Sequence, residues 1–257
     1  MIDYLYPQLR RGLVGAWCPS MDRSRSTLLT DLSRFSNTSS RLGTGYHNAT
    51  PKGLGVHING TLGSTTDWGY RFASPVVDNT KPFTAICSFV VPDATTATQC
   101  VFGNTAEEYL DGFNINIQSG TSTIRLQVGG SGVYTTVNIY SFSPGSREHV
   151  TASIVFNYST ITCRVNNVVQ SVSRTESIPS TYPLFIGATY RTATTVLYPF
   201  SSTITEASVY QQALSQSELS TLSQRVGIAH ETRRQSRGKA PTVASSRRNN
   251  MMIGCGF

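Results

Sequence analysis

The stretch FSSTITEASVYQQALSQSEL, residues 200–219, holds the pattern of a strand followed closely by the start of a helix. Residues 204–210 carry β-branched and aromatic side chains, which favour a strand. Polar residues then separate this segment from a serine at position 215 that has the features of a helix cap. We therefore expect a closing strand, a short turn and one helix near the end of the folded part.

The helix start has two independent signals. Ser215 precedes Glu218 by three residues, the spacing of a capping box, in which each side chain accepts a hydrogen bond from the other residue's backbone amide. Leu214 and Leu219 occupy the two positions of a hydrophobic staple, which fixes the direction in which the chain enters the helix. The pattern predicts a helix over about residues 216–226.

Strand patterns recur through the rest of the chain at intervals of about 8–12 residues. Residues 83–91 form a nearly apolar run, and residues 113–117 and 124–128 alternate apolar with polar side chains on either side of a turn. The alternation predicts a hairpin with one buried face. An asparagine pair at 166–167 suits the positive φ of a type I′ turn. Together these signals predict about ten to twelve strands in an antiparallel β-sandwich.

The composition agrees with an all-β chain. Of 257 residues, 39% are hydrophobic, 10% aromatic and 14% charged. The charged fraction is about half the usual quarter, and this argues against a helical bundle or coiled coil. No apolar run reaches 18 residues, and the first residues lack the charged-then-apolar order of a signal peptide. We expect one β-sandwich domain over residues 12–229, no membrane span and no secretory leader.

The order of these segments resembles the concanavalin A-like lectin/glucanase fold, in its laminin-G-like branch. Residues 200–219 are similar to the family's closing run F-x-G-x-I-D-E-V-x-I-Y-x-x-A-L-S-x-x-E-I. Residues 184–187 resemble the L-x-I-G before it, residues 149–152 the H-V-A strand, and residues 56–60 the L-x-F-D-G segment. The resemblance covers roughly residues 12–226 and implies a jelly-roll sandwich with one short C-terminal helix.

Two departures from the family pattern bear on metal binding. Asn59 and Thr205 stand where the family has aspartates, so fewer carboxylates remain for calcium, which takes six to eight oxygen ligands. Asp31, Asn37 and Glu206 could contribute oxygens, but hydrogen bonding within turns is the favoured interpretation of these residues. We expect neither a metal ion nor another cofactor.

Catalytic patterns are missing from the sequence. Glycosidases on this fold need two carboxylates beside the scissile bond, and the glucanase branch carries them as E-x-D-x-x-E or a near variant. The densest acidic stretch, residues 107–111, has another spacing and is followed by Gly112, which indicates a loop. The chain also lacks G-x-S-x-G, P-loop and H-E-x-x-H motifs. We expect no catalytic residues and a protein that is not an enzyme.

Four aromatic residues are candidates for stacking on sugars. Trp68 lies in a polar loop, and Tyr134, Tyr190 and Tyr198 are placed where they could line loop ends. Aromatic faces bind ligands in this way, although buried packing is their commoner use. Trp17 belongs to the first expected strand, so we assign it to the core.

The cysteines and one histidine are interpreted as structural. Cys18, Cys87, Cys100 and Cys163 are widely spaced without a C-x-x-C pair, and a fifth, Cys255, lies in the tail. We expect small buried thiols rather than a disulfide framework, as in a protein made in a reducing cytosol. His149 matches the family's H-V-A strand and is expected to be structural.

The basic charge is concentrated at the C-terminal end. Residues 230–257 carry a net +5 of the chain's +7, and they end on an apolar segment. We interpret them as an assembly arm that docks on another protein, with residues 1–11 as an N-terminal arm. A tail for nucleic acid alone would not need the apolar end, and an unattached tail is the alternative. The arm residues are Arg233, Arg234, Arg237, Lys239, Arg247, Arg248, Met252, Ile253 and Phe257.

The opening, L-Y-P followed by R-G-L-V-G-A-W-C-P-S, resembles laminin-G-like proteins carried by tailed bacteriophages. In phages such modules serve as capsid decorations, head fibres or tail adhesins. The resemblance implies a non-enzymatic structural protein of the virion, made in the host cytoplasm. Its expected partners are capsid or tail proteins, further copies of itself and cell-surface glycans, but not nucleic acid. The alternative is a free carbohydrate-binding lectin module.

Overall fold

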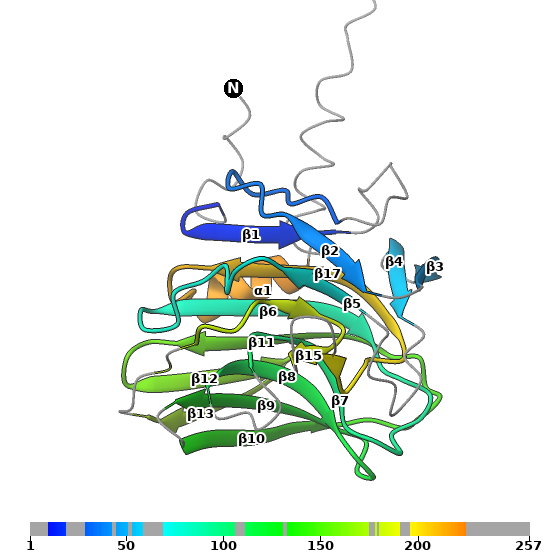
Figure 1. Cartoon of the computed structure of the whole chain (residues 1–257). Helices are drawn as coiled ribbons and strands as arrows, with labels where there is room; N and C mark the ends of the chain where they lie inside the picture. Colours follow the sequence, from blue (N-terminus) through cyan, green and yellow to red (C-terminus); the bar gives the residue numbers. More distant parts are fainter. Residues whose placement is uncertain are drawn as a thin grey trace, which may run out of the picture.

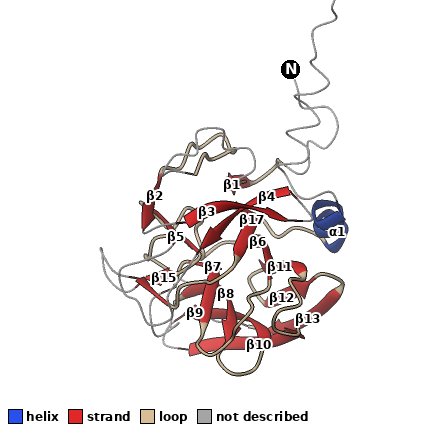
Figure 2. Ribbon diagram, turned by 90° about the vertical axis from the view of Figure 1, so that its right-hand side faces the viewer, coloured by secondary structure: helices blue, strands red, loops and turns tan. Residues whose placement is uncertain are grey.

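The computed structural model of the chain describes residues 10–18, 29–42, 45–50, 53–58, 69–105, 111–130, 133–174, 178, 180–190 and 196–224. These residues form two large antiparallel sheets that pack face to face, with one helix outside them (Figures 1 and 2). The expected all-β antiparallel sandwich with one short helix is confirmed.

The first sheet has eight strands in the order β13-β12-β11-β6-β17-β4-β3, and β1 also pairs with β17. The closing strand of the sequence, β17, therefore lies in the middle of this sheet, between β6 and β4. The strands are β1 (Leu13–Trp17), β3 (Gly45–Thr50), β4 (Gly53–Ile58), β6 (Phe83–Val90), β11 (His149–Phe156), β12 (Thr160–Val165), β13 (Val168–Ser173) and β17 (Thr203–Tyr210).

The second sheet has seven strands in the order β10-β9-β8-β7-β14-β5-β2. A separate two-stranded ribbon, β15–β16, follows β14 in the chain. The strands are β2 (Ser39–Leu42), β5 (Gly69–Phe72), β7 (Gln99–Gly103), β8 (Gly112–Gln118), β9 (Thr123–Gly130), β10 (Val133–Ser141), β14 (Phe185–Ile186), β15 (Thr189–Tyr190) and β16 (Val196–Leu197).

The core lies between the two sheets because every second side chain of a strand points to the same face. Phe83 of β6 contacts Phe113 of β8 across the sandwich, with ring centroids 5.3 Å apart. Trp17, expected in the core, is 1% exposed and packs on Phe72 at 4.4 Å. The four described cysteines are buried and free, as predicted, and burial raises the pKa of the Cys163 thiol to about 12. These thiols are therefore inert core residues.

The polar face of the β8–β9 hairpin is buried as well, which corrects the expectation of one buried face. Asn114 and Asn116 are fully buried, and Gln127 is 3% exposed. Asn116 Nδ2 donates to Gln127 Oε1 at 2.6 Å, and Arg125 Nε donates to Asn116 Oδ1 at 2.8 Å. Hydrogen bonding between these side chains offsets the cost of removing them from water.

Helix α1 (Gln216–Gln224) covers part of the outer face of the eight-stranded sheet (Figure 2). The predicted capping box is present: Glu218 N donates to Ser215 Oγ at 3.3 Å, and Ser215 N donates to Glu218 Oε2 at 2.7 Å. Leu214 and Leu219 are both buried in the apolar cluster beneath the helix. The predicted helix thus forms, and residues 225–226 lie outside the described part.

Two buried or nearly buried arginines tie distant elements together. Arg164 on β12 donates to Ser220 Oγ of α1 at 2.8 Å. Arg174, 2% exposed, follows β13 and donates to the carbonyl oxygens of Val128, Gly130 and Val133 at 3.1–3.3 Å. The hydrogen bonds of Arg174 join the end of one sheet to the β9–β10 hairpin of the other. Both guanidinium groups therefore serve the fold.

The expected two-residue loop between β12 and β13 is present, since Val165 pairs with Val168. It is not the expected type I′ turn, because that turn needs a positive φ at both central residues and only Asn166 has one, at 52°. No helix in the described part of the chain is long and apolar enough to cross a membrane.

Candidate binding pockets

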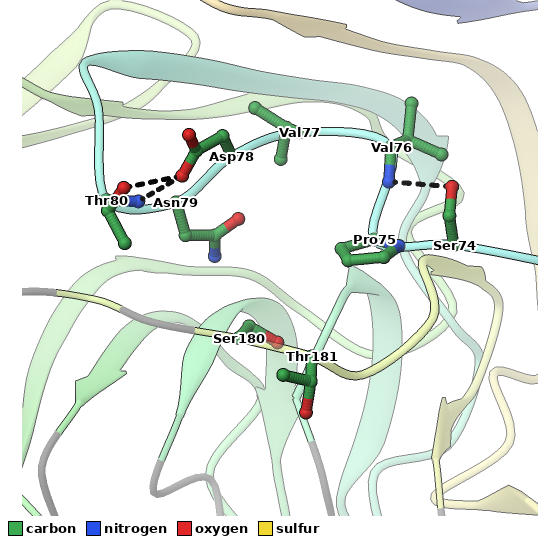
Figure 3. A pocket seen from close by; sticks show the side chains of 9 residues that line it. All are labelled: Ser74, Pro75, Val76, Val77, Asp78, Asn79, Thr80, Ser180 and Thr181. Atoms are coloured by element: carbon green, nitrogen blue, oxygen red, sulfur yellow. Dashed lines mark hydrogen bonds between the residues drawn. The ribbon is translucent and has the colours of Figure 1, made fainter.

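A shallow pocket of about 480 Å³ opens beneath the connection between β5 and β6 (Figure 3). Its wall is residues 74–80, and residues 180–181 face that wall from the connection that leads to β14. Hydroxyl groups, one carboxylate and a proline ring line this space, which we name the loop pocket. The lining residues are Ser74, Pro75, Val76, Val77, Asp78, Asn79, Thr80, Ser180 and Thr181.

The wall of the loop pocket is fixed from behind by a pair of buried amides. Asn79 Nδ2 donates to Asn104 Oδ1 at 3.2 Å, and Asn104 Nδ2 donates back to Asn79 Oδ1 at 3.0 Å. Asn104 Oδ1 also accepts from Phe113 N at 3.0 Å. Gly112 beside it has a φ of 86°, and a Cβ there would collide with the Asn104 carbonyl. The pocket wall is therefore attached to the seven-stranded sheet.

The opposite side of the loop pocket is anchored to the same residue. Ser180 Oγ donates to the Asn104 carbonyl oxygen at 2.6 Å. Both sides of the pocket thus depend on Asn104, although they lie about a hundred positions apart in the sequence. Such shared support keeps the polar groups in place before a ligand arrives, which lowers the cost of binding.

Asp78 is the one carboxylate among the lining residues of the loop pocket. Its Oδ1 accepts from Thr80 N at 3.1 Å and Thr80 Oγ1 at 2.6 Å, and its Oδ2 lies 2.9 Å from Lys81 Nζ. The hydrogen bonds from Thr80, and then that from Lys81, lower the pKa of Asp78 to about 2. The carboxylate is therefore charged at physiological pH, and its 43% exposure leaves it accessible to a hydroxyl donor.

The backbone of this pocket is strained at Val76. Its φ is 67°, a left-handed conformation in which a β-branched residue is rarely found. Val76 N donates to Ser74 Oγ at 3.3 Å, which helps to hold the turn. Such strained conformations persist only where the surrounding structure holds them in place, and they cluster at ligand sites.

An exposed aromatic ring lies near the loop pocket. Tyr158, in the turn between β11 and β12, is 61% exposed, and its ring centroid lies 6.4 Å from that of Phe156. Phe156 pairs with Phe83, so the turn that carries Tyr158 lies beside the segment of Lys81, which directly follows the pocket wall. The tyrosine face is therefore available for stacking beside the pocket.

A second and larger pocket, of about 770 Å³, lies where the chain enters β1. Three arginines and one exposed phenylalanine surround a floor of apolar side chains, and we name it the arginine pocket. The lining residues are Arg10, Arg11, Gly12, Leu13, Val14, Leu32, Ser33, Arg34, Phe35 and Gln211.

Asp31 supports the arginine pocket from within the fold. Its two carboxylate oxygens accept five hydrogen bonds, at 2.6–3.0 Å, from Ala16 N, Ser33 N, Ser33 Oγ, Asn37 N and Asn37 Nδ2. These bonds are the turn contacts that the sequence offered as an alternative to calcium binding. In the described part of the chain, no three histidine, cysteine, aspartate or glutamate side chains form a group that could hold a metal ion.

Thr205, which stands where the family has an aspartate, belongs to a structural hydrogen-bond chain. Its hydroxyl donates to the Ser88 carbonyl oxygen at 3.0 Å and lies 2.8 Å from His149 Nε2. Because the single hydroxyl proton goes to Ser88, His149 Nε2 is assigned as the donor in the second bond. The structural interpretation of His149 is thus supported.

Of the four aromatic residues proposed from the sequence, Tyr134 and Tyr198 lie apart in the structure. Tyr134 on β10 is 54% exposed, whereas Tyr198 follows β16 and is half-buried, its carbonyl accepting from Cys100 N of β7. Strands β9 and β8 separate β10 from β7, which places them about 14 Å apart at the usual strand spacing. The backbone of Tyr190 ends β15, and Trp68 lies outside the described residues. Neither Tyr134 nor Tyr198 is among the described residues that line either pocket.

The remaining predicted residues also fall outside the described part. They are the assembly-arm residues from Arg233 to Phe257, together with Cys255, Asn59, Glu107 and Glu108. The two pockets, in contrast, were missed by the sequence interpretation. The sequence signals for the loop pocket were loop-forming residues: the Ser74-Pro75 pair, and the Asp78 to Pro82 segment.

Residues 64–220 match the family model of the concanavalin A-like lectin/glucanases superfamily, Laminin_G_3. The chain belongs to this superfamily. All described lining residues of the loop pocket lie within the matched residues 64–220. Most of those of the arginine pocket precede them in the sequence. A comparison with curated proteins finds no match.

Solved structures share the fold of this superfamily member at low sequence identity. The binding domain of Paraclostridial Mosquitocidal Protein 1 is 14% identical, with a TM-score of 0.63 over 84% of this chain and 52% of that one. This chain thus spans about half the length of that domain. Domain 4 of a GH43 extracellular arabinanase from Geobacillus stearothermophilus, solved with arabinotriose, is 13% identical, with a TM-score of 0.61 over 81% of this chain and 97% of that one.

A hydrolase also contains the fold. Trypanosoma rangeli sialidase, solved with sialic acid, is 15% identical, with a TM-score of 0.57 over 84% of this chain and 34% of that one. The superfamily fold therefore occurs both in binding domains and within an enzyme chain. At these identities the likeness concerns the fold alone, and function must be argued from the pockets.

Proposed function

We propose that this chain is a non-enzymatic glycan-binding protein whose loop pocket holds neutral sugar residues. The observation that carries the proposal is the accessible, charged carboxylate of Asp78 in a pocket whose other described lining residues supply hydroxyl groups, one amide, two valines and a proline ring. Sugar hydroxyls donate well to carboxylates, and such charge-assisted bonds are about twice as strong as neutral ones. The exposed ring of Tyr158 adds an aromatic face for stacking.

The loop pocket is better suited to binding than to hydrolysis. Glycoside hydrolysis uses two carboxyl groups about 5–10 Å apart, one of which must donate a proton. Asp78 is the only carboxylate among the described residues that line this pocket, and its pKa of about 2 leaves it without a proton at neutral pH. These facts support the non-enzymatic assignment.

Binding of the full chain to a glycan array, followed by titration with the best neutral oligosaccharide, tests this function. We expect Asp78→Asn to weaken that affinity about tenfold, since the charged acceptor is lost. Asp93→Asn is the matched control, because Asp93 is exposed but does not line the pocket. Equal affinities for the two variants, or release of reducing sugar by the wild-type chain, would contradict the proposal.

We further propose that the chain is a structural component of a phage particle, as a capsid decoration, head fibre or tail adhesin. The observation that favours this role is the composition of residues 230–257, which combine six basic side chains with an apolar end. The basic groups would steer the arm to an acidic surface of a capsid or tail protein, and Met252, Ile253 and Phe257 would fill pockets there. Burial of Phe257 would contribute about 1.5–3 kcal/mol.

Deletion of residues 230–257 tests the arm. We expect the truncated chain to keep its thermal unfolding midpoint but to disappear from purified particles, as measured by quantitative mass spectrometry. Phe257→Ala should lower the copy number without abolishing it. Normal incorporation of the truncated chain would refute the arm. A chain absent from particles yet active on glycan arrays would instead be the free lectin.

A further inference from the structure

We propose that the arginine pocket binds the carboxylate of an acidic sugar residue, such as a sialic or uronic acid. The inference rests on the proposed glycan-binding function but uses a different set of side chains. Arg11 and Arg34 are exposed and line this pocket together with Arg10. No aspartate or glutamate is among the described lining residues.

The nearby carboxylate of Asp31 keeps its negative charge, but it is not among the described lining residues and forms no salt bridge with Arg11 or Arg34. Its five hydrogen-bond donors come from β1 and from the turn that follows it. The exposed guanidinium groups of Arg11 and Arg34 outnumber this one carboxylate, so the described part of the pocket keeps a positive charge that an anion would balance.

Arg34 is arranged to bind a planar anion. Its guanidinium carbon lies 4.9 Å from the centroid of the Phe35 ring. A guanidinium that rests on an aromatic face keeps its in-plane N–H groups directed outward, and these fit both oxygens of a carboxylate at once. Stacking on Phe35 thus orders the side chain before binding, so less rotamer entropy is lost when the carboxylate arrives.

The rest of the pocket fits a sugar ring. Phe35 is 50% exposed, so part of its ring remains open, and Leu13, Val14 and Leu32 supply apolar surface. Sugars pair such apolar contacts on their C–H faces with polar contacts on their edges. A volume of about 770 Å³ lies within the range of small-ligand sites. A concave site of this kind favours a compact acidic sugar over an extended acidic peptide.

NMR titration of the full-length chain tests this assignment with matched ligands. The probes are N-acetylneuraminic acid and its methyl ester, which differ in the charge of a single carboxyl group. We expect the ester to bind at least tenfold more weakly than the acid, because it loses a charge-assisted bidentate contact. Raising the salt concentration from 50 to 300 mM should weaken binding of the acid more than that of the ester.

Protein variants locate the site. Arg34→Gln and Arg11→Gln should each weaken acid binding about tenfold. Arg147→Gln is the matched control, since Arg147 is exposed in the β10–β11 connection and lines neither pocket. Asp78→Asn should leave acid binding unchanged while it impairs the neutral site, so the two sites can be distinguished.

Several results would overturn the inference. Equal affinities of the acid and its ester would show that the carboxylate charge does not contribute to binding. An effect of Arg34→Gln no larger than that of Arg147→Gln would show that the acid does not bind in the arginine pocket. Tighter binding of hexaglutamate than of the sugar acid would assign this surface to an acidic protein segment. Loss of acid binding in Asp78→Asn alone would place the acid in the loop pocket, which would leave the proposed glycan-binding function intact.

Discussion

The loop pocket and the arginine pocket are linked through Gln211, but their nearby aspartates have opposite roles. Gln211 lines the arginine pocket, while its side chain bonds the backbone of Asp78: Nε2 donates to Asp78 O, and Oε1 accepts from Asp78 N. Asp78 presents its carboxylate to the loop pocket, whereas Asp31 turns its carboxylate away from the arginine pocket into a turn. One pocket therefore carries an acceptor and the other carries cations.

The number of donors around each carboxylate explains this difference. Asp31 accepts five hydrogen bonds and has no acceptor capacity left for a ligand. Asp78 accepts two bonds from Thr80 and one from Lys81, which leaves part of Oδ2 free. The same residue type is thus a structural element in one place and a candidate ligand group in the other.

The arginines divide in the same way. Arg164 and Arg174 use their guanidinium groups on side-chain and carbonyl oxygens inside the fold. Arg11 and Arg34 are exposed at a pocket instead. A basic side chain therefore points to an anionic ligand only where the fold has not already supplied its acceptors.

Asn104→Ala should disrupt the loop pocket, and among the substitutions considered it should lower the stability of the chain most. The substitution removes the hydrogen bonds to Asn79 and Phe113 and leaves buried amide groups without partners. We expect a loss of about 2–4 kcal/mol in the free energy of unfolding, measured by urea denaturation. Binding of neutral sugar should fall as well, because the pocket wall at Asn79 loses its attachment, while the bond from Ser180 to the backbone carbonyl of residue 104 remains.

Binding of acidic sugar should survive in the Asn104→Ala chain, since the arginine pocket makes no contact with that amide pair. Asn138→Ala, an exposed substitution on β10, serves as the control and should change stability by less than about 0.5 kcal/mol. If Asn104→Ala affected both pockets equally, the two would have to be regarded as one site.

Asp31→Ala is the converse experiment in the arginine pocket. It removes five hydrogen bonds from the turn that carries Arg34 and Phe35, although Asp31 is only partly buried. We expect a loss of about 2–3 kcal/mol, together with weaker binding of acidic sugar but unchanged binding of neutral sugar. An unchanged affinity for the acid, measured by NMR titration, would show that the turn does not organise this pocket.

Most of the sandwich could be predicted from local sequence patterns. The alternation around Ile115 and Leu126 indicated the β8–β9 hairpin, and the Ser215 capping box indicated α1. Strands β14, β15 and β16 have two residues each, too few for a period to show. The burial of Asn114 and Asn116 could not be foreseen either, because alternation reveals which face is polar but not whether that face is covered.

The pockets could not be predicted because their parts come together only in the folded chain. Asp78 and Ser180 lie about a hundred residues apart in sequence and meet through Asn104, which belongs to neither segment. Searching for aromatic residues selected Tyr134 on β10 and Tyr198 after β16, and did not select Tyr158. Residue type suggested the chemistry, but the hydrogen-bond partners decide which side chains are left for a ligand.

Gln211→Ala should affect both pockets, because Gln211 lines the arginine pocket and its side chain bonds to the backbone of Asp78 in the loop pocket. The side chain makes three hydrogen bonds, to the backbone of Asp78 and to the carbonyl of Pro82. We expect a loss of about 1 kcal/mol and a moderate weakening of both neutral and acidic sugar binding. Ser215→Ala is the matched control: it should cost about 1 kcal/mol through the helix cap yet leave both affinities unchanged. Equal sugar affinities in Gln211→Ala and Ser215→Ala would show that the Gln211 side chain supports binding in neither pocket.

The smallest effect concerns the charge of Asp78 and appears only in acid. Its folded-state pKa of about 2 lies below the ordinary 3.8, so its stabilising contribution is present above pH 4 and is lost as the pH falls toward 2. The difference in unfolding free energy between wild type and Asp78→Asn should therefore be constant from pH 7 to 5 and shrink between pH 4 and 2. Neutral-sugar affinity should fall only as the pH approaches 2, because it depends on the ionisation of the carboxylate in the folded chain. Thr80→Val removes the larger cause of the low pKa and should move the lower end of this window to higher pH. A wild-type difference that stays constant down to pH 2, measured by urea denaturation at each pH, would mean that Thr80 and Lys81 do not hold the carboxylate as the structure indicates.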